Sequence, residues 1–184
     1  MNYKFLKKEL VYDGTQLAPH WIYKKTQILG DAIVSFIGPA NVPLENMVDL
    51  EDVVNQAPIY SPLMLHFLIE HFNCDLKNIV FCQRIFCAIV LEELLKKIGS
   101  TKIIRRGDDL FEQDKKLSVS IATISPVSGL IHLGINIETK GTPVPTKGLK
   151  DYQIDPKEFA ELVMKRYVEE MLMVETAKCK VRPV

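Results

Sequence analysis

The stretch from Arg105 to Glu138 limits the fold of this chain more than any other part of its sequence. It contains three groups of turn-forming residues, which are Gly107-Asp108-Asp109, Asp114-Lys115 and Ser125-Pro126-Val127-Ser128-Gly129. Gly, Asp, Pro and Ser at this spacing are typical of tight turns between short strands. Between Leu117 and Ile124, apolar residues nearly alternate with Ser and Thr, which is the pattern of a strand with one buried face. The stretch therefore predicts short antiparallel strands joined by tight turns.

Charged side chains gather at the ends of these predicted strands. The first turn contributes Asp108 and Asp109, and the strand before it ends in Arg105 and Arg106. Successive strand residues point to opposite faces, so only one arginine can face a pocket, and we expect it to be Arg106. Lys116 opens the next strand, where its ammonium group can hang over the end of the sheet. These residues predict a binding site; the alternatives are ordinary turn chemistry for the aspartates and a solvated lysine at a strand end.

Helix and strand signals elsewhere predict an α+β fold. Asp75 is a suitable N-cap for a helix that ends near Lys97, before Gly99. Asp155 followed by Pro156 opens a second long helix, which ends near Ala177. Strands are predicted at 3–12, 31–37 and 63–71, a helix at 16–28, and irregular chain at 40–61 and 139–155. We expect the 184 residues to form a single domain, 1–184.

His66 is a further candidate for the site. In the strand 63–71 it shares a face with Glu70, and we expect it to be a satisfied polar residue that lines a pocket. The alternative is a metal site that combines His66 with His71 and Asp75. No third ligand has a convincing spacing for such a site, so no metal ligand is predicted.

Two other pairs of polar residues interrupt apolar elements. Gln83 and Arg84 lie within the apolar run of the first long helix. Either Arg84 extends to water along that helix, or the pair reaches a ligand pocket. His132 and Asn136 lie on one face of the last predicted strand, so either can line the same site.

Two motifs resemble those of biotin and lipoate protein ligases. They are the run DDLFEQDKKLS at 108–118 and the sequence Gly134-Ile135-Asn136. The resemblance implies that Lys116 is the catalytic lysine and that Asp109 is the aspartate that holds Mg²⁺ or orients the ligand. It also implies ATP and Mg²⁺ as cofactors in the activation of a small carboxylic acid. Asp108 and Val119 depart from the pattern, because the ligases carry Asn and Gly there.

Nearly the whole chain resembles a prokaryotic family described as domain of unknown function 366. The shared stretches are YDGTQL at 12–17, GDAIV at 30–34, MVDLED at 47–52 and KLSVSIA at 116–122. That family is placed, by fold, with class II aminoacyl-tRNA synthetases and biotin/lipoate protein ligases. The resemblance implies an α+β fold in which helices flank a mainly antiparallel sheet.

The segment around Asp49 is the largest departure from the ligases. Where they carry a basic, glycine-rich loop, this chain has the acidic residues Asp49, Glu51 and Asp52. Carboxylates repel a triphosphate unless a cation lies between them. We therefore expect Asp49 to contribute to ligand binding, through Mg²⁺ or a cationic ligand, with a solvated acidic loop as the alternative.

The amino-acid composition limits the classes of binding partner that we expect. The 23 acidic and 23 basic residues balance, which argues against nucleic acid and against an anionic membrane surface. The first residues lack the apolar core of a signal peptide, and the four cysteines show no paired spacing, so we expect a reduced, cytoplasmic protein. An exposed edge strand favours a homodimer.

Three functions fit these observations. The first is an enzyme that binds or activates a small carboxylic acid with a nucleotide. The second is a non-catalytic protein that binds a small molecule or regulates through it on the same scaffold. The third, a tRNA-associated factor, is disfavoured by the balanced charge.

Overall fold

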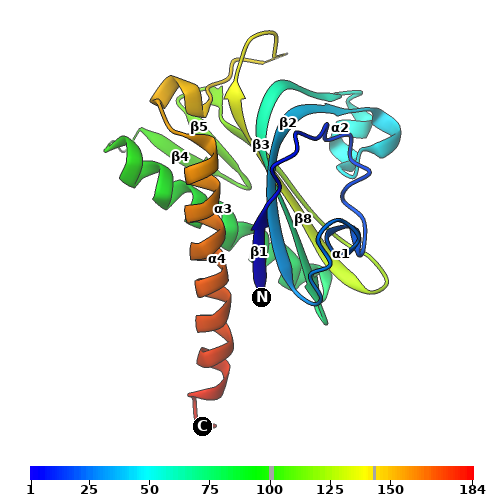
Figure 1. Ribbon diagram of the computed structural model, residues 1–184, viewed down its shortest axis with the longest axis vertical. Coiled ribbons are helices and arrows are strands. Elements are labelled where there is room, and N and C mark those ends of the chain that lie inside the picture. Colours follow the sequence, from blue (N-terminus) through cyan, green and yellow to red (C-terminus); the bar gives the residue numbers. More distant parts are fainter. Residues whose placement is uncertain (100–101, 143) are drawn as a thin grey trace.

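A five-stranded sheet organises the chain, in the order β1-β2-β3-β8-β7. The computed structural model describes residues 1–99, 102–142 and 144–184 (Figure 1). The strands are β1 (Asn2–Phe5), β2 (Ala32–Val42), β3 (Ile59–Phe72), β7 (Ser118–Ile124) and β8 (Ser128–Glu138). β1 pairs with β2 in parallel, and the other three pairings are antiparallel. The predicted α+β fold with a mainly antiparallel sheet is therefore confirmed.

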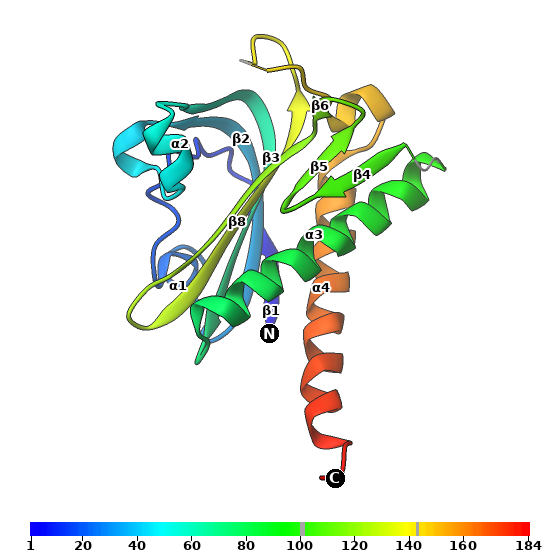
Figure 2. The same cartoon turned by 180° about the vertical axis from the view of Figure 1, so that it is seen from behind.

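Two long helices cover one face of this sheet. They are α3 (Leu76–Ile98) and α4 (Pro156–Cys179), and their buried residues form the larger core with the sheet (Figure 2). Asp75 and Asp155 cap them as predicted, because each carboxylate accepts a hydrogen bond from a backbone N–H of the first turn. Among the described residues, no helix combines the length and the apolar character needed to cross a membrane.

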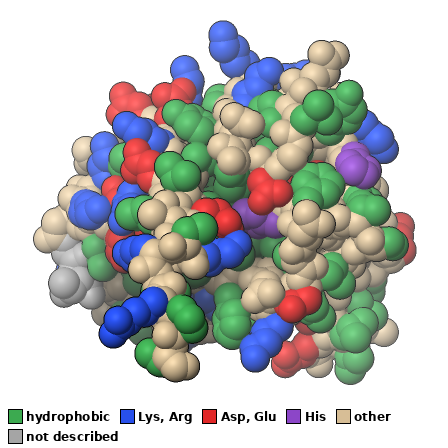
Figure 3. Space-filling model, turned by 90° about the horizontal axis from the view of Figure 1, so that it is seen from below, with side chains coloured by type: hydrophobic (Ala, Val, Ile, Leu, Met, Phe, Trp, Pro, Cys, Tyr) green, Lys and Arg blue, Asp and Glu red, His purple; other side chains and the backbone are tan. Residues whose placement is uncertain are grey.

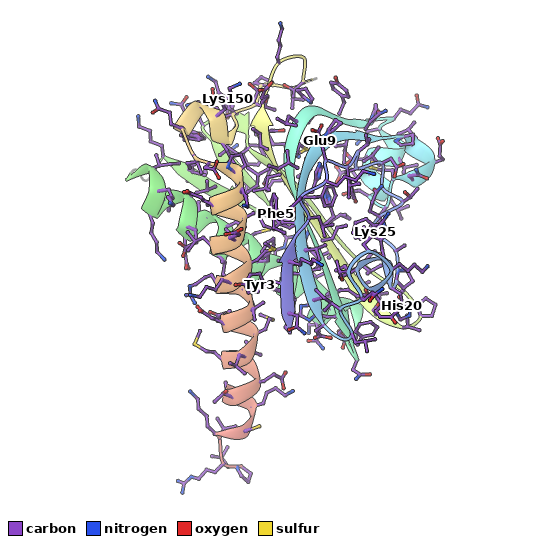
Figure 4. The ribbon with its side chains drawn as sticks, viewed as in Figure 1. Tyr3, Phe5, Glu9, His20, Lys25 and Lys150 are labelled. Carbon is purple, nitrogen blue, oxygen red and sulfur yellow. The ribbon has the colours of Figure 1, made fainter. Side chains whose placement is uncertain are left out.

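Shorter elements cover the opposite face. They are α1 (Trp21–Thr26), the 3₁₀ helix η1 (Leu44–Asn46) and α2 (Leu50–Val54), and a smaller core lies beneath them. Figure 4 shows Tyr3 and Phe5 on β1 near α4, whereas His20 and Lys25 project from the other side of the sheet, around α1. The side chain of Phe5 packs against the larger core.

Several predicted boundaries were wrong. The helix predicted at 16–28 is only α1, because His20 has a left-handed backbone (φ 61°) directly after Pro19. The strand predicted at 3–12 is reduced to β1 and one bridge from Tyr12 to Ala40. The strand predicted at 31–37 continues across a bulge to Val42. The two segments predicted as irregular contain η1, α2 and the 3₁₀ helix η2 (Leu149–Tyr152).

A second, three-stranded sheet lies beside β7. It consists of β4 (Ile103–Arg106), β5 (Asp109–Glu112) and β6 (Lys115–Lys116), joined by two of the predicted turns. The prediction that only one face of β7 is buried was wrong, because both faces of the strand are covered. Ser118 accepts a hydrogen bond from the Leu110 N–H (2.8 Å) and Ser120 accepts one from Gln83, so the serines face the helix side. Val119 lines a cavity on the other face, because both faces of β7 are covered and its hydroxyls are satisfied internally.

A buried network ties α4 to the sheet. His71 Nδ1 donates to Asp31 Oδ2 (2.8 Å), and His71 Nε2 lies 2.8 Å from the Tyr167 hydroxyl. Although burial opposes it, the pKa of Asp31 is lowered by hydrogen bonds from His71 and from the Phe72 N–H. The proton on His71 Nδ1 leaves Nε2 as the acceptor of the Tyr167 hydroxyl in the neutral ring. The metal site considered for His71 is therefore replaced by this network.

Tyr167→Phe is expected to lower the free energy of unfolding by about 1–2 kcal/mol, because it leaves His71 Nε2 buried without a donor. Urea denaturation measures the change. Tyr23→Phe is the matched control, since Tyr23 is 44% exposed, and it is expected to change stability by less than about 0.5 kcal/mol. Equal stability of the two variants would show that the His71–Tyr167 contact contributes nothing.

Candidate functional site

A cavity of about 510 Å³ lies on the sheet face opposite α3 and α4. Its walls come from β7 and β8, from the segments around η1 and α2 and from the β4–β5 turn. Gly141, Thr142, Val144 and Thr146 complete them. Most of the lining is apolar, including Val42, Met64 and Ile121. Segments far apart in the sequence therefore meet at one hollow, which is where a small ligand is usually held.

Lys116 is fixed at this cavity by its backbone. Its N–H donates to the Pro145 carbonyl (2.9 Å), and its own carbonyl accepts from the Lys147 N–H (3.1 Å). Its ammonium group lies 2.6 Å from Asp109 Oδ2, and the side chain is 32% exposed. The two residues predicted to be catalytic are thus in direct contact, and both line the cavity.

Burial dominates the electrostatics of Asp109. It raises the pKa of this carboxyl from 3.8 to about 6, and the ion pair with Lys116 offsets only part of that rise. The second oxygen, Oδ1, is shielded from solvent and has no hydrogen-bond partner among the described residues. Near neutral pH, Asp109 can therefore exchange a proton in response to a change in nearby charge.

The charge at the cavity is mainly acidic. Asp49, Asp52, Asp108 and Asp109 line it together with the single cation Lys116, among the residues that the structure describes. Burial and the neighbouring Asp49 raise the pKa of Asp52. The chain as a whole has 23 acidic and 23 basic residues, and the face shown in Figure 3 carries side chains of both signs. The local excess of carboxylates thus belongs to the cavity.

Asp108 is held from behind by α3. Gln83 Nε2 donates to Asp108 Oδ2 and to Ser120 Oγ, both at 3.0 Å. Arg84 Nη1 lies 3.2 Å from Asp108 Oδ1 as an ion pair. Gln83 and Arg84 therefore orient a cavity carboxylate from outside the cavity lining, which differs from direct contact with a ligand.

Asn136 and Asp49 also line the cavity, and each has a structural task. Asn136 Oδ1 accepts from the Ser61 hydroxyl (2.9 Å), and its Nδ2 donates to the Lys116 carbonyl (3.4 Å). Asp49 caps α2 by accepting from the N–H groups of residues 51 and 52. Asn136 therefore helps to position Lys116.

Like Gln83 and Arg84, two further predicted ligand-binding residues, Arg106 and His66, lie outside the cavity lining. Arg106 is 3.8 Å from Asp114 and covers the ring of Phe111, so it belongs to the outer surface of the small sheet. The expectation that His66 lines a pocket is also wrong. It is fully buried behind His132, and His132 is the histidine that lines the cavity. Period-two alternation places both histidines on this face but cannot say which one is covered.

Asp52 and Tyr12 also line the cavity, and neither was predicted as a site residue. Asp52 belongs to the acidic segment that begins at Asp49, and Tyr12 opens the YDGTQL motif. Both signals were present in the sequence. The interaction of Asp52 with Lys116 depends on how the 43–58 segment folds back over the sheet.

Asp109→Asn is expected to reveal the raised pKa of Asp109. A carboxyl whose folded pKa is raised contributes most stability below its unfolded pKa and loses that contribution as the pH rises through its folded pKa. Relative to Asp109→Asn, the wild type should therefore lose on the order of 2 kcal/mol of unfolding free energy between about pH 4 and about pH 7. Urea denaturation across this range measures the difference.

Asp114→Asn serves as the control, because Asp114 is 98% exposed and its substitution leaves Asp109 unchanged, so this variant should keep the pH dependence of the wild type. A wild type that gains stability over Asp109→Asn as the pH rises would mean that the ion pair outweighs burial and lowers the pKa of Asp109.

Comparison with known proteins identifies the family. The family described as "Domain of unknown function (DUF366)" matches residues 1–182. Uncharacterized protein MJ0805 of Methanocaldococcus jannaschii is 41% identical over 160 residues, covering 84% of this chain and 72% of that protein. A solved structure, a protein of unknown function from Pyrococcus horikoshi, has a TM-score of 0.92 at 40% identity and covers 99% of both chains.

More distant solved structures show the fold alone. A biotin protein ligase from Aquifex aeolicus, in complex with biotin and ATP, has a TM-score of 0.62 at 17% identity, covering 91% of this chain and 69% of that one. Ta0514, a putative lipoate protein ligase from T. acidophilum with bound lipoic acid, has a TM-score of 0.60 at 15% identity, covering 94% and 86%. The predicted resemblance is confirmed. This chain belongs to the DUF366 family, on the fold of the biotin and lipoate protein ligases.

Proposed function

We propose that this protein binds a small carboxylic acid in the cavity and activates it with a nucleotide. The observation that carries the proposal is the 2.6 Å contact between Lys116 Nζ and Asp109 Oδ2 inside a largely apolar cavity. In this step a carboxylate oxygen attacks the α-phosphate of ATP, the bond from the α-phosphate to the bridging oxygen breaks, and pyrophosphate leaves. The two reactants are both anions and must approach each other. A fixed ammonium group lowers the cost of that approach without transferring a proton.

Asp109 has a defined part in this proposal. Its raised pKa means that it takes up a proton readily once another anion approaches. A substrate carboxylate that enters the cavity can then replace Asp109 as the partner of Lys116. The neutral carboxyl remains as a hydrogen-bond donor beside the reacting groups.

The fold's ligases also raise the question of a metal ion. The described residues contain no group of three or more His, Cys, Asp or Glu side chains arranged to hold one. No step of the proposed activation uses a resident metal. Mg²⁺ that accompanies a nucleotide is held mainly by the phosphates and by one or two carboxylates. Asp52 and Asp109 are cavity carboxylates that interact with Lys116.

A second candidate is a non-catalytic binding protein, favoured by the four aspartates that line the cavity beside one lysine. Such a lining disfavours an unaccompanied triphosphate. In this case the cavity holds a small molecule and no bond is made. Ligand-dependent stabilisation without pyrophosphate release distinguishes it from activation.

Lys116→Ala tests the proposed activation. Purified protein is incubated with ATP, Mg²⁺ and a panel of small acids that includes biotin and lipoic acid, and pyrophosphate release is measured. Removal of the ammonium group is expected to slow release by about 10²–10³-fold, the effect of losing one preorganised electrostatic contact. Lys116→Arg is expected to recover little, because a guanidinium does not reproduce the compact charge of an ammonium.

Lys115→Ala is the matched control, since the neighbouring lysine is exposed and lies outside the cavity lining. It should retain wild-type release. If no acid in the panel yields pyrophosphate above Lys116→Ala, the activation proposal is contradicted, and binding by thermal shift then decides the second candidate.

A further inference from the structure

Two buried histidines lie in contact with each other beside the cavity, and the proposed activation does not use them. His66 is fully buried, and His132, one strand away on β8, lines the cavity. The ring of Tyr12 stacks on His132 with centroids 3.7 Å apart and planes 11° apart. Phe36 stacks on His66 at 4.9 Å. The aromatic packing therefore fixes the orientation of both rings.

The backbone sets the tautomer of His66. Its Nε2 lies 3.1 Å from the carbonyl oxygen of Gly38, which can only accept a hydrogen bond. The proton of the neutral ring is therefore on Nε2. Burial lowers the pKa of His66 to about 4, so the ring is neutral at pH 7 and its Nδ1 carries a lone pair.

The tautomer of His66 determines the tautomer of His132. His66 Nδ1 lies 3.1 Å from His132 Nε2, and a bare Nδ1 requires that His132 Nε2 donates. Burial, and then the neighbouring His66, lower the pKa of His132, which keeps that ring neutral as well. Its single proton is thus on Nε2, so His132 Nδ1 is an acceptor. No described residue donates a hydrogen bond to it.

A buried pair of histidines does not by itself require that one ring nitrogen lack a protein partner. His132 Nδ1 is not among the described buried side-chain atoms that lack a partner, so it is not sealed from solvent. Here the chain from Gly38 through His66 satisfies three ring nitrogens and leaves the fourth, on the residue that lines the cavity. The walls around it are largely apolar, so an unfilled acceptor there favours a ligand that supplies a donor.

We propose that His132 Nδ1 is a fixed hydrogen-bond acceptor that selects ligands carrying an N–H or O–H donor apart from their carboxyl group. The inference rests on the proposed function only in taking the cavity as the ligand site. It names the substrate class as a small acid with such a donor, as opposed to a purely hydrocarbon acid. His66 acts as a positioning residue, because it holds the tautomer of His132.

Nitrogen-15 NMR of the labelled histidines tests the tautomers without a substrate. The chain contains four histidines, so His66 and His132 can be assigned from single substitutions. At neutral pH, both rings are expected to carry the proton on Nε2, with His132 Nδ1 unprotonated. A proton on His132 Nδ1 would overturn the proposal.

Two small probes then test the selection. 2-Pyrrolidinone and cyclopentanone have the same ring size, and only the first carries an N–H. Saturable movement of the His132 Nδ1 resonance is expected with 2-pyrrolidinone and not with cyclopentanone. His132→Phe keeps a ring at this position but has no nitrogen to observe, so binding to it is followed by the backbone amide shifts of residues that line the cavity. It is expected to bind the two probes equally, whereas the exposed His20→Asn is expected to keep the preference for 2-pyrrolidinone by the same measurement. Equal response to both probes, or no saturable response to either, would overturn the proposal.

These outcomes are independent of the pyrophosphate assay. If the protein prefers 2-pyrrolidinone but releases no pyrophosphate, the activation proposal is rejected and the proposal for His132 Nδ1 stands. If pyrophosphate is released but His132 Nδ1 carries a proton, the proposal for His132 Nδ1 is rejected and the activation proposal stands.

Discussion

The contact between Lys116 and Asp109 depends on how a very short strand is held. β6 contains two residues, and a strand this short has little stability of its own. Hydrogen bonds with β5 on one side and with residues 145–147 on the other keep it in place. The ammonium group therefore has a fixed origin at the edge of the cavity. Burial of Asp109 beside it keeps the charge state of the pair responsive to whatever enters.

The acidic lining distinguishes this cavity from a general anion site. Asp108 is oriented by Gln83 and Arg84 from α3, and Asp49 is occupied by capping α2. Asp52 and Asp109 remain as the carboxylates with raised pKa values. The cavity thus combines two aspartates that can be protonated with one lysine, an arrangement that can accommodate an anion by taking up protons.

Local signals in the sequence predicted the local structure well. The caps at Asp75 and Asp155, the end of α3 at Gly99 and the first two turns of the 105–138 stretch depend on interactions within a few residues. The burial of the serine face of β7 could not be predicted in this way. The hydroxyls of Ser118 and Ser120 are satisfied by Leu110 and Gln83, which tertiary contacts bring close.

The candidate site follows the same division. Lys116, Asp109, Asp108, Asn136 and Asp49 were predicted from motifs, and all five line the cavity. Arg106 and His66 were expected there and lie elsewhere, because a strand pattern gives the face of a residue and not the layer that covers it. Their roles in ligand binding, like those of the other predicted residues, stay predictions, and so do the homodimer and the cytoplasmic location.

The central claim is that Lys116 and Asp109 face the same bound acid. A crystal structure of the protein with a non-hydrolysable ATP analogue and the best-bound acid from the panel tests it most directly. The claim predicts a ligand carboxylate oxygen within hydrogen-bonding distance of Lys116 Nζ, with the phosphates in the same cavity. An acid bound elsewhere, with the ion pair between Lys116 and Asp109 unchanged, would contradict it.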